Sequence, residues 1–481
     1  MPKPVLVLFR NDLRISDNPA LHAAAETGAP VIAAYILDNE TSGRWRAGAA
    51  SRWWLHYSLS ALQQRLAGLG ATLVLRKGPF ATEALRLARD AGASATFWNR
   101  SYEPSQAAQD RALADGLVAS GITPHGFNAS LLFDPAAIRT NGGTGFLVFT
   151  PFWRACLSAP SPKQPLPAPK HLIAALHGLA RLELAELGLL PRAPDWAQGL
   201  RETWTPGENA ARNRLADFLD EGLAEYASAR DRPDMPGTSR LSPHLHFGEL
   251  SARTIWHAVQ HCVAAEPALQ RSADKFLSEL GWREFSAHLL HHTPDLPEEN
   301  LRAGFDQFPW ADDAKALRAW TRGQTGIPIV DAGMRELWQT GSMHNRVRMI
   351  AASFLVKHLL IDWRKGADWF WDTLVDADLA SNAASWQWVA GCGADAAPFF
   401  RIFNPVLQGE RFDPQGRYVR RFVPELARLP DAHIHAPWRA PQDVRDASDV
   451  QLGKTYPHPI IDLAHGRERA LAAFARLRKA A

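Results

Sequence analysis

Short apolar runs alternate with helix-like stretches over the first 130 residues, and this alternation constrains the fold more than any other feature. The runs are Val5–Phe9, Val31–Leu37, Thr72–Leu75 and Ala95–Trp98. They are rich in β-branched residues, which is typical of parallel strands buried on both faces. The intervening stretches carry helix start and stop signals, over Pro19–Thr27, Ala50–Leu69 and Ala81–Ala91. Strands and helices in turn predict a doubly wound α/β sheet.

The turn that follows the first predicted strand has the sequence FRNDLRISDNP and contains no glycine. The glycine-rich fingerprint of dinucleotide-binding sheets is therefore absent at this turn. No Walker-type phosphate loop occurs in the sequence either. The sheet can still bind a ligand at its switch point, but the sequence leaves the chemistry of that ligand open.

The pattern of apolar residues, prolines and helix signals changes twice along the 481 residues. This predicts two large units joined by a connector. Residues 1–130 are predicted as the Rossmann-like sheet domain, and 131–205 as a long connector. The connector contains the tract APSPKQPLPAPK, whose prolines favour an extended and fairly stiff conformation. Residues 206–481 show helical patterns cut by Pro and Gly, so we expect an all-α domain there.

The composition excludes several classes of protein. Apolar residues make up 46% and charged residues 21%, which argues against disorder. With 53 Lys and Arg against 50 Asp and Glu, any basic surface must be local. Cys156, Cys262 and Cys392 are too few for a disulfide framework or a four-thiolate cluster. No apolar run is long enough for a membrane span or a signal peptide, so we expect a cytoplasmic protein without membrane attachment.

The 18 tryptophans are the one compositional oddity, because the chain has only 6 tyrosines. Most tryptophans in any protein pack in cores or interfaces. The remainder could stack on a flat ligand or a nucleobase, or carry an electron, because indole is an oxidisable ring.

A turn rich in hydroxyl groups, Gly237–Pro243 (GTSRLSP), is the first candidate site in the helical part. Its hydroxyls can cap helices, or they can receive phosphate oxygens together with backbone N–H groups. Tyr226 and Arg230 lie one helical turn apart just upstream and could cover the same ligand. The residues alone leave both interpretations open.

The segment Glu279–Phe285 (ELGWREF) is the second candidate. At helical spacing Glu279, Trp282 and Arg283 share one face. A carboxylate, an indole and a guanidinium can form an ordinary solvated face, or they can grip an aromatic ligand that makes hydrogen bonds.

The segment Met343–Met349 (MHNRVRM) is the third candidate. Asn345 and Met349 form one i, i+4 pair, and His344 and Arg348 form another. These groups can contact phosphates or bases, although most basic helices are simply solvated.

The segment from Asp376 to Trp388 is the fourth candidate. If it is helical, Asp376 and Asp378 point about 200° apart, which argues against a shared metal ion. The same angle separates Trp386 from Trp388, so the two indoles would address different neighbours.

These motifs together closely resemble the photolyase/cryptochrome family. The likeness runs in consistent order along nearly the whole chain, through VLFRNDLRISDNPAL, GTSRLSP, LGWREF, TGIPIVDAGMREL, MHNRVRMI, FLVKHLLIDW, SNAASWQWVA and APFFRIFNP. The resemblance implies an N-terminal α/β antenna domain and a C-terminal helical domain that holds FAD. It also implies light-driven reversal of pyrimidine dimers in DNA, or light sensing without repair.

The resemblance assigns a set of residues to the flavin. The matching positions are Tyr226, Thr238, Ser239, Arg240, Leu241, Ser242, Phe276, Arg348, Asp376, Asp378 and Asn382. Arg348 and Asp376 match an ion pair beside the isoalloxazine ring, and Asn382 matches the residue that faces flavin N5. Plant cryptochromes have Asp at this last position and animal ones Cys. A neutral amide should favour the fully reduced flavin that repair requires.

The resemblance also defines a substrate pocket, which would be formed by Glu279, Trp282, Asn345, Met349 and Trp388. Relatives that repair (6-4) photoproducts have two proton-donating histidines where this chain has Asn345 and Met349. The bacterial (6-4) branch binds an iron–sulfur cluster through four cysteines, and this chain has three. The prediction is repair of cyclobutane pyrimidine dimers, with Arg283 and Arg346 contacting DNA phosphates.

Three tryptophans match the electron relay of the family, namely Trp310, Trp363 and Trp386.

The expected partner is UV-damaged DNA, which a monomer without an obligate protein partner would bind by lesion and not by sequence. Residues 401–481 hold 14 Lys and Arg against 9 Asp and Glu. This segment is therefore basic, although the formal net charge of the whole chain is only +3.

The antenna chromophore is less defined by the resemblance. Folate-binding relatives carry an Asn-Glu pair where this chain has Ser105-Gln106. The departure leaves methenyltetrahydrofolate, a deazaflavin, FMN or no second chromophore as alternatives.

The competing functions are a photosensory cryptochrome and a flavoprotein that binds DNA without repairing it. The helix-rich C-terminal sequence and Asn382 favour repair.

Overall fold

The computed structural model describes residues 2–41, 43–175, 178–396 and 400–480. These residues form two compact units. The first unit comprises Met1–Ala224, Ser239–Pro294 and Val375–Ala380. The second unit comprises Glu225–Thr238, Asp295–Leu374 and Ser381–Ala481. Each unit is described below by itself.

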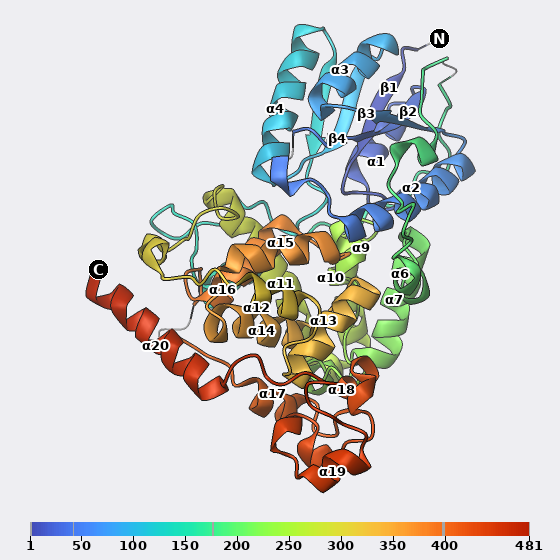
Figure 1. Cartoon of the computed structure of the whole chain (residues 1–481). Helices are drawn as coiled ribbons and strands as arrows, with labels where there is room; N and C mark the ends of the chain where they lie inside the picture. The colour runs from blue at the N-terminus through green and yellow to red at the C-terminus, as the bar shows by residue number, and fades with distance from the viewer. Residues whose placement is uncertain (1, 42, 176–177, 397–399, 481) are drawn as a thin grey trace. The chain divides into compact units, whose positions relative to one another are not determined.

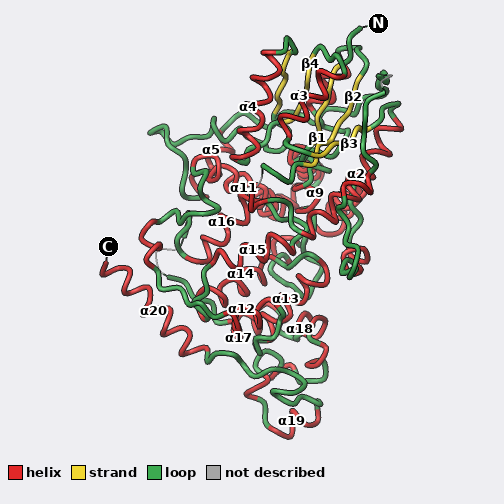
Figure 2. Tube along the Cα trace, turned by 45° about the horizontal axis from the view of Figure 1, so that its top comes forward, coloured by secondary structure: helices red, strands yellow, loops and turns green. Residues whose placement is uncertain are grey.

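A five-stranded sheet forms the centre of the N-terminal part of the first unit (Figures 1 and 2). Its strands are β1 (Val5–Phe9), β2 (Val31–Leu37), β3 (Leu73–Lys77), β4 (Ala95–Asn99) and β5 (Thr123–Phe127). They run in the order β3-β2-β1-β4-β5, and every neighbouring pair is parallel. The strand order reverses between β1 and β4, as a doubly wound sheet requires.

Two helices cover each face of this sheet (Figure 1). The helices are α1 (Pro19–Glu26), α2 (Ala49–Gly68), α3 (Phe80–Asp90) and α4 (Pro104–Ala119). Alternate residues of β1 enter different cores, because successive side chains of a strand point to opposite faces. Val5 and Val7 pack with α1 and α2, whereas Leu6 and Leu8 pack with α3 and α4. The predicted α/β architecture is confirmed.

The remainder of the first unit is helical. It contains α5 (Phe149–Ser158), η2 (Leu184–Leu187), α6 (Gln198–Thr203), α7 (Glu208–Asp217), η3 (Phe218–Gly222), α9 (Ser242–His246), α10 (Ala252–Ala265), η4 (Pro267–Leu269) and α11 (Gln270–His292). The proline tract has neither helix nor strand over 160–169, as expected. The helix α5 lies inside the predicted connector and was not anticipated. The domain limits 1–130, 131–205 and 206–481 stay a prediction.

The second unit is helical throughout its described residues, apart from turns and one isolated bridge. Its elements are α8 (Tyr226–Ala229), η5 (Ala303–Gln307), α12 (Ala314–Thr321), α13 (Pro328–Thr340), α14 (Asn345–Ser353), η6 (Phe354–His358), α15 (Trp363–Thr373), α16 (Leu379–Ala390, which starts in the first unit), α17 (Pro405–Phe412), α18 (Arg417–Phe422), η7 (Pro424–Leu426), η8 (Asp431–His433), η9 (Pro437–Arg439), α19 (Gln442–Ala447) and α20 (Leu463–Ala480). The predicted all-α part is therefore confirmed. Within the described ranges, no helix combines the length and the apolar character that a membrane crossing needs.

Candidate functional site

The hydroxyl turn and the acidic turn before α16 meet in the first unit. The Ser242 hydroxyl donates a hydrogen bond to Asp376 Oδ2 at 2.6 Å. Arg240 has a left-handed backbone with φ 54°, and its guanidinium lies 4.3 Å from the ring centroid of Trp204. Residues predicted to bind the flavin thus come together from two distant segments of the chain. The guanidinium donates hydrogen bonds, the carboxylates accept them, and the hydroxyls can do either.

Asp376 and Asp378 precede α16 instead of lying within it, because that helix begins at Leu379. The angle of about 200° that a helix would give them therefore does not apply. His246 Nδ1 lies 3.9 Å from Asp378 Oδ2. Among the described residues, no group of three or more His, Cys, Asp and Glu side chains could hold a metal ion.

Two apolar members of the predicted flavin set line the interior of the first unit. Phe276 on α11 is buried, and its ring centroid lies 4.6 Å from that of Phe218. Leu241, in the hydroxyl turn, is also buried. These side chains act as packing groups in this unit.

The other predicted flavin residues, Tyr226, Thr238, Arg348 and Asn382, belong to the second unit. Tyr226 is buried, and the Arg230 guanidinium lies 5.7 Å from its ring centroid. Arg348 Nε donates to the backbone oxygen of Met343 at 2.7 Å. Asn382 Nδ2 donates to the backbone oxygen of Ala367 at 3.1 Å, which orients the amide on α16.

The donor set of the predicted flavin residues fits FAD. Ser239, Ser242 and the guanidinium of Arg240 suit a pyrophosphate, because hydroxyls and cations satisfy its oxygens. Asn382 offers a neutral amide, which suits an uncharged ring edge. The pairing predicted between Arg348 and Asp376 joins residues of different units and stays a prediction.

Three predicted substrate residues follow one another along α11 in the first unit. Trp282 is partly exposed and stacks on Phe149, with ring centroids 3.8 Å apart and an interplanar angle of 7°. Glu279 Oε1 lies 3.7 Å from Lys275 Nζ, one turn earlier. Arg283 Nη1 donates to the backbone oxygen of Ser130 at 2.8 Å. The predicted helical face exists. Sequence reasoning missed Phe149, which belongs to α5 and stacks on this face through Trp282.

Asn345 and Met349 lie on successive turns of α14 in the second unit, as their spacing predicts. Between them, Arg346 Nη2 lies 2.9 Å from Asp231 Oδ2. The Arg346 guanidinium also lies 4.4 Å from the ring centroid of Phe412. This arginine, predicted to contact DNA phosphates, therefore already has an acidic partner. Trp388 is partly exposed on α16 and donates its N–H to the backbone oxygen of Asp395 at 3.1 Å.

His344 is the N-cap of α14, one turn before Arg348, whose backbone N–H donates to the His344 backbone oxygen at 2.9 Å. Its Nδ1 accepts a hydrogen bond from the backbone N–H of Arg346 at 3.2 Å. Burial lowers the pKa of His344 from 6.5 to about 4. The imidazole is therefore neutral near pH 7.

The three predicted relay tryptophans all belong to the second unit. Trp386 and Trp363 are buried, whereas Trp310 is partly exposed beside Phe308, with ring centroids 4.4 Å apart. The Trp363 N–H donates to Asn300 Oδ1 at 2.9 Å. The burial thus falls from the first two indoles to the third, as a path from the interior to solvent requires.

Trp386 packs tightly against α15, the helix that begins with Trp363. A Cβ at Gly366 would overlap with Trp386 Cη2, so the helix must have glycine where the indole lies. Phe370, one turn further along α15, contacts Trp386 edge-on with ring centroids 5.0 Å apart. The buried Trp320 is a further neighbour at 6.2 Å.

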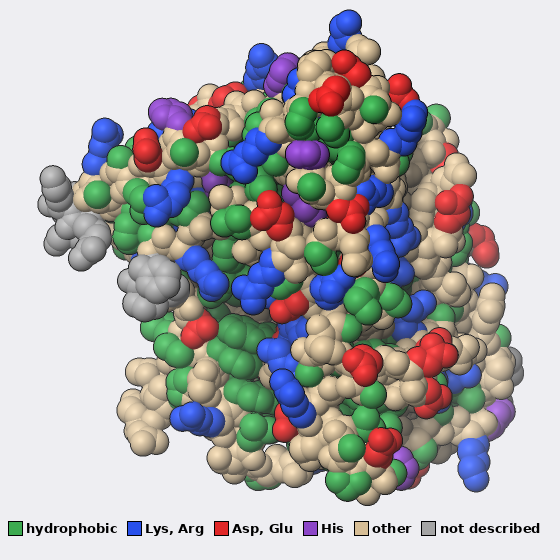
Figure 3. Space-filling view, turned by 90° about the horizontal axis from the view of Figure 1, so that it is seen from below, with side chains coloured by type: hydrophobic (Ala, Val, Ile, Leu, Met, Phe, Trp, Pro, Cys, Tyr) green, Lys and Arg blue, Asp and Glu red, His purple; other side chains and the backbone are tan. Residues whose placement is uncertain are grey.

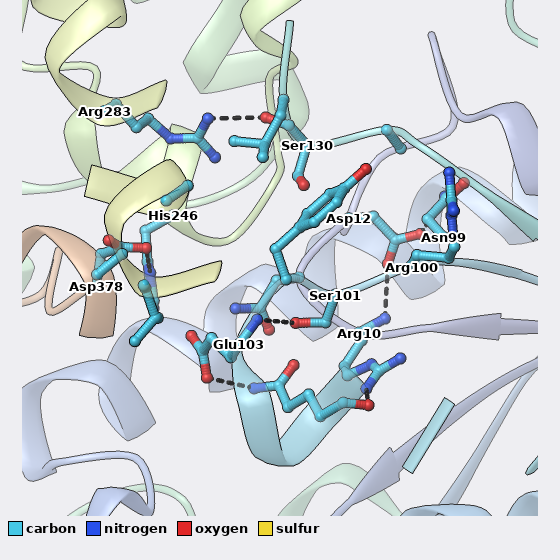
Figure 4. Close-up of a pocket in the computed structure, with 18 residues that line it drawn as sticks. Arg10, Asp12, Asn99, Arg100, Ser101, Glu103, Ser130, His246, Arg283 and Asp378 are labelled. Carbon is cyan, nitrogen blue, oxygen red and sulfur yellow. Dashed lines mark hydrogen bonds and ion pairs between the residues drawn. The ribbon is translucent and has the colours of Figure 1, made fainter. Parts of the chain in front are cut away.

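A polar pocket lies at the carboxyl ends of β1 and β4 in the first unit (Figure 4). Its lining includes Arg10, Asp12, Asn99, Tyr102, Glu103, Gln106, His246, Arg283 and Asp378. The strand order reverses at this edge, which is where ligands of doubly wound sheets bind. Gln106 lines the pocket, whereas its neighbour Ser105 is exposed and does not.

Three buried polar atoms of this pocket have no hydrogen-bond partner among the residues that the structure describes; they are Arg10 Nε, Tyr102 Oη and Gln106 Oε1. Burial, and then the negative charge of Asp378, raise the pKa of Glu103 from 4.5 to about 7. Gln106 Nε2 donates to Glu103 Oε2 at 2.8 Å. Since buried polar groups are normally satisfied, this set fits a ligand with both donors and acceptors.

Charges of both signs are interspersed on the face drawn in Figure 3, with blue Lys and Arg side chains beside red Asp and Glu side chains. This mixture agrees with a formal net charge of only +3. Any affinity for a polyanion must therefore come from particular basic side chains.

The doubly wound sheet, the helical remainder and the set of residues that fits FAD define a two-part flavoprotein. A family model described as "DNA photolyase" matches residues 5–170, and one described as "FAD binding domain of DNA photolyase" matches residues 276–476. The deoxyribodipyrimidine photo-lyase of Agrobacterium fabrum is 52% identical over 480 residues, which cover 99% of this chain and 98% of the relative. Cryptochrome-1 of Arabidopsis thaliana is 40% identical over 98% of this chain and 70% of its own length.

The crystal structure of a class III photolyase from Agrobacterium tumefaciens has a TM-score of 0.96 and 51% identity, covering 100% of this chain and 98% of that one. The chain therefore belongs to the photolyase/cryptochrome family, as its motifs indicated. It carries the FAD-binding domain of that family, and the prediction of an enzyme of the photolyase type is confirmed.

Proposed function

We propose that this protein repairs cyclobutane pyrimidine dimers in UV-damaged DNA under blue light. FAD, fully reduced and photoexcited, would supply the electron that opens the dimer. The residues of this chain bind the lesion, orient it and keep it stacked; the cofactor carries the redox chemistry. The alternative substrate, a (6-4) photoproduct, needs a proton donor beside it.

We choose the cyclobutane dimer over the (6-4) photoproduct because the predicted substrate residues on α14 offer no proton donor. Asn345 and Met349 occupy successive turns of that helix, and neither side chain is an acid near pH 7. The adjacent His344 has a pKa of about 4, and its Nδ1 accepts a hydrogen bond from the backbone N–H of Arg346. It is therefore neutral near pH 7 and cannot act as the acid that gives the proton. Splitting a cyclobutane ring requires no proton shuttle.

Trp282 and Trp388 are the apolar walls of the proposed lesion site. Photolyases extrude the damaged bases from the duplex, and a lesion that stacks poorly costs less to extrude. Indole rings replace the stacking that the flipped bases lose. Asn345 and Glu279 offer hydrogen-bonding groups for the polar edges of the pyrimidines. Binding should depend on the lesion and on salt, and not on the surrounding sequence.

The test is illumination of the reduced protein with UV-irradiated oligothymidine, followed by the recovery of thymine absorbance. Cyclobutane repair predicts recovery that needs both blue light and reduced protein. An oligonucleotide with a single (6-4) photoproduct is the matched control and should stay unrepaired. Repair of the (6-4) lesion alone would contradict the proposal. Lesion binding without repair would favour a photosensory cryptochrome or a non-repairing DNA-binding flavoprotein.

We further propose that the protein acts as a cytoplasmic monomer, without an obligate protein partner.

The pocket at the carboxyl ends of β1 and β4 is our candidate for a second, light-harvesting chromophore. Its unpartnered Arg10, Tyr102 and Gln106 atoms suit the hydrogen-bonding edge of a pterin, deazaflavin or flavin ring. Glu103, with a pKa of about 7, can donate a hydrogen bond as a neutral acid. Reconstitution with methenyltetrahydrofolate, a deazaflavin or FMN should give a new absorption band that Glu103→Ala weakens and Ser105→Ala leaves unchanged. An equal loss in both variants would contradict this placement.

A further inference from the structure

An aromatic pair joins two helices of the first unit that are distant in the sequence. The ring of Phe149, the first residue of α5, stacks on the indole of Trp282 in α11 at 3.8 Å and 7°. Both residues are partly exposed. A stacked ring occupies one face of the indole, so any ligand that stacks on Trp282 must use the other face.

The backbone of α5 is fixed on α11 independently of this pair. Trp153, one turn after Phe149, lies against Gly281, where a Cβ would be only 2.7 Å from Trp153 Cε3. Phe152 packs against Phe285 and His288, with ring centroids 5.2 Å and 4.9 Å away. Replacing the Phe149 ring should therefore leave the position of α5 unchanged.

The loop that leads into α5 is also braced. Arg139 Nη1 donates to the backbone oxygen of Gly143 at 3.0 Å, and Thr140 N donates to the backbone oxygen of Thr144 at 2.9 Å. The backbone N–H of Phe146 donates to His288 Nε2 at 2.8 Å. The Phe149 ring thus lies on a constrained backbone although its own side chain is partly exposed.

We propose that Phe149 is a positioning residue for the lesion, acting through Trp282. The inference rests on the proposed function, in which Trp282 is one wall of the dimer site. By covering one face of the indole, Phe149 restricts the rotamers of Trp282 and leaves a single face for the dimer. A preorganised side chain loses less conformational entropy when the ligand binds.

The experiment compares Phe149→Leu, Phe149→Tyr and the control Phe152→Leu, each as the full-length flavoprotein. Phe152→Leu changes a buried ring on the same helix that does not contact Trp282. We measure dark affinity for an oligothymidine with one cyclobutane dimer and for the undamaged oligomer. In the free protein we record the ¹⁹F spectrum after 5-fluorotryptophan labelling, with the Trp282 signal assigned from Trp282→Phe.

Phe149→Leu should lower affinity for the dimer about tenfold, leave affinity for undamaged DNA unchanged, and leave repair per absorbed photon near wild type at saturating DNA. It should also shift the Trp282 fluorine signal. Phe149→Tyr should restore both the affinity and the signal, because tyrosine stacks equally well. Phe152→Leu should change neither.

Two results would overturn the positioning role: Phe149→Leu with an unchanged Trp282 signal, or equal losses for damaged and undamaged DNA. Failure of the proposed function looks different, because the wild type would then fail to repair the dimer, or Trp282→Ala would keep full lesion affinity.

Discussion

The N–H of Trp363 donates a hydrogen bond to Asn300 Oδ1 at 2.9 Å, in a part of the second unit where the indole is fully buried. Asn300 in turn donates to Asp306 Oδ1 at 2.6 Å. A buried indole with a fixed acceptor keeps one orientation, which matters for a group that passes electrons between neighbours. Trp363, which is predicted as the middle member of a relay with Trp386 and Trp310, is thus held in one orientation.

Trp386→Phe should block light-driven reduction of the oxidised flavin by at least about tenfold, because phenylalanine is not oxidised as readily as indole. Repair by enzyme that has been reduced chemically should stay near wild type, since it does not use the relay. Flavin absorbance under blue light with an external reductant measures the first activity, and thymine recovery the second. Trp320→Phe removes a buried indole that also contacts Trp386 and should change neither. Loss of both activities in folded Trp386→Phe would assign this residue another role.

Gly366→Ala should destabilise the protein by about 1–3 kcal/mol, which is the usual cost of inserting a methyl group into a filled core. The new Cβ would overlap with the Trp386 ring, and Phe370 blocks the indole on another side. Urea unfolding measures the effect. Gly304→Ala is the control, because a Cβ there meets open space. Equal stability of the two variants would show that Trp386 can move away from α15.

The sequence predicted β1, β2, β3 and β4 because their buried residues form largely apolar runs. It missed β5, which has the sequence TPHGF and contains no fully buried residue. This strand lies at the sheet edge, where it pairs only with β4 and therefore tolerates proline and glycine. Periodicity cannot detect a five-residue strand whose only apolar contact with the core comes from the partly buried Phe127 at its end.

The candidate site was predictable to the extent that it depends on spacing within one helix. Glu279, Trp282 and Arg283 on α11 follow from helical periodicity, whereas their roles came from the family resemblance. Phe149 could not be predicted, because its stack on Trp282 joins residues that only the tertiary structure brings together. Arg10 and Asn99 did carry a signal, since both follow the apolar part of neighbouring strands.

Asp231→Asn should strengthen DNA binding if Arg346 contacts phosphates. Asp231 Oδ2 lies 2.9 Å from Arg346 Nη2 and competes with a phosphate for it. Removing the acidic partner should raise affinity about two- to threefold at low salt and steepen the dependence on salt by up to about 0.9 per freed contact. Titrations at several salt concentrations measure both changes. The gain should vanish in the double variant with Arg346→Gln; a gain that persists there would place the phosphate contact elsewhere.

Glu284→Gln should remove part of the dependence of stability on pH. Burial raises the pKa of Glu284 from 4.5 to about 7, although the backbone N–H groups of Leu132 and Phe133 donate to its carboxylate. Between these values the folded state binds more protons than the unfolded state, so the free energy of unfolding falls as the pH rises. This contribution is complete below about pH 4.5 and lost once the pH has risen through about 7. Relative to wild type, Glu284→Gln should therefore gain about 2–3 kcal/mol between pH 4.5 and 7.5. Urea unfolding across this range measures the difference, with the exposed Glu40→Gln as control; a flat difference would mean that Glu284 stays ionised in the folded protein.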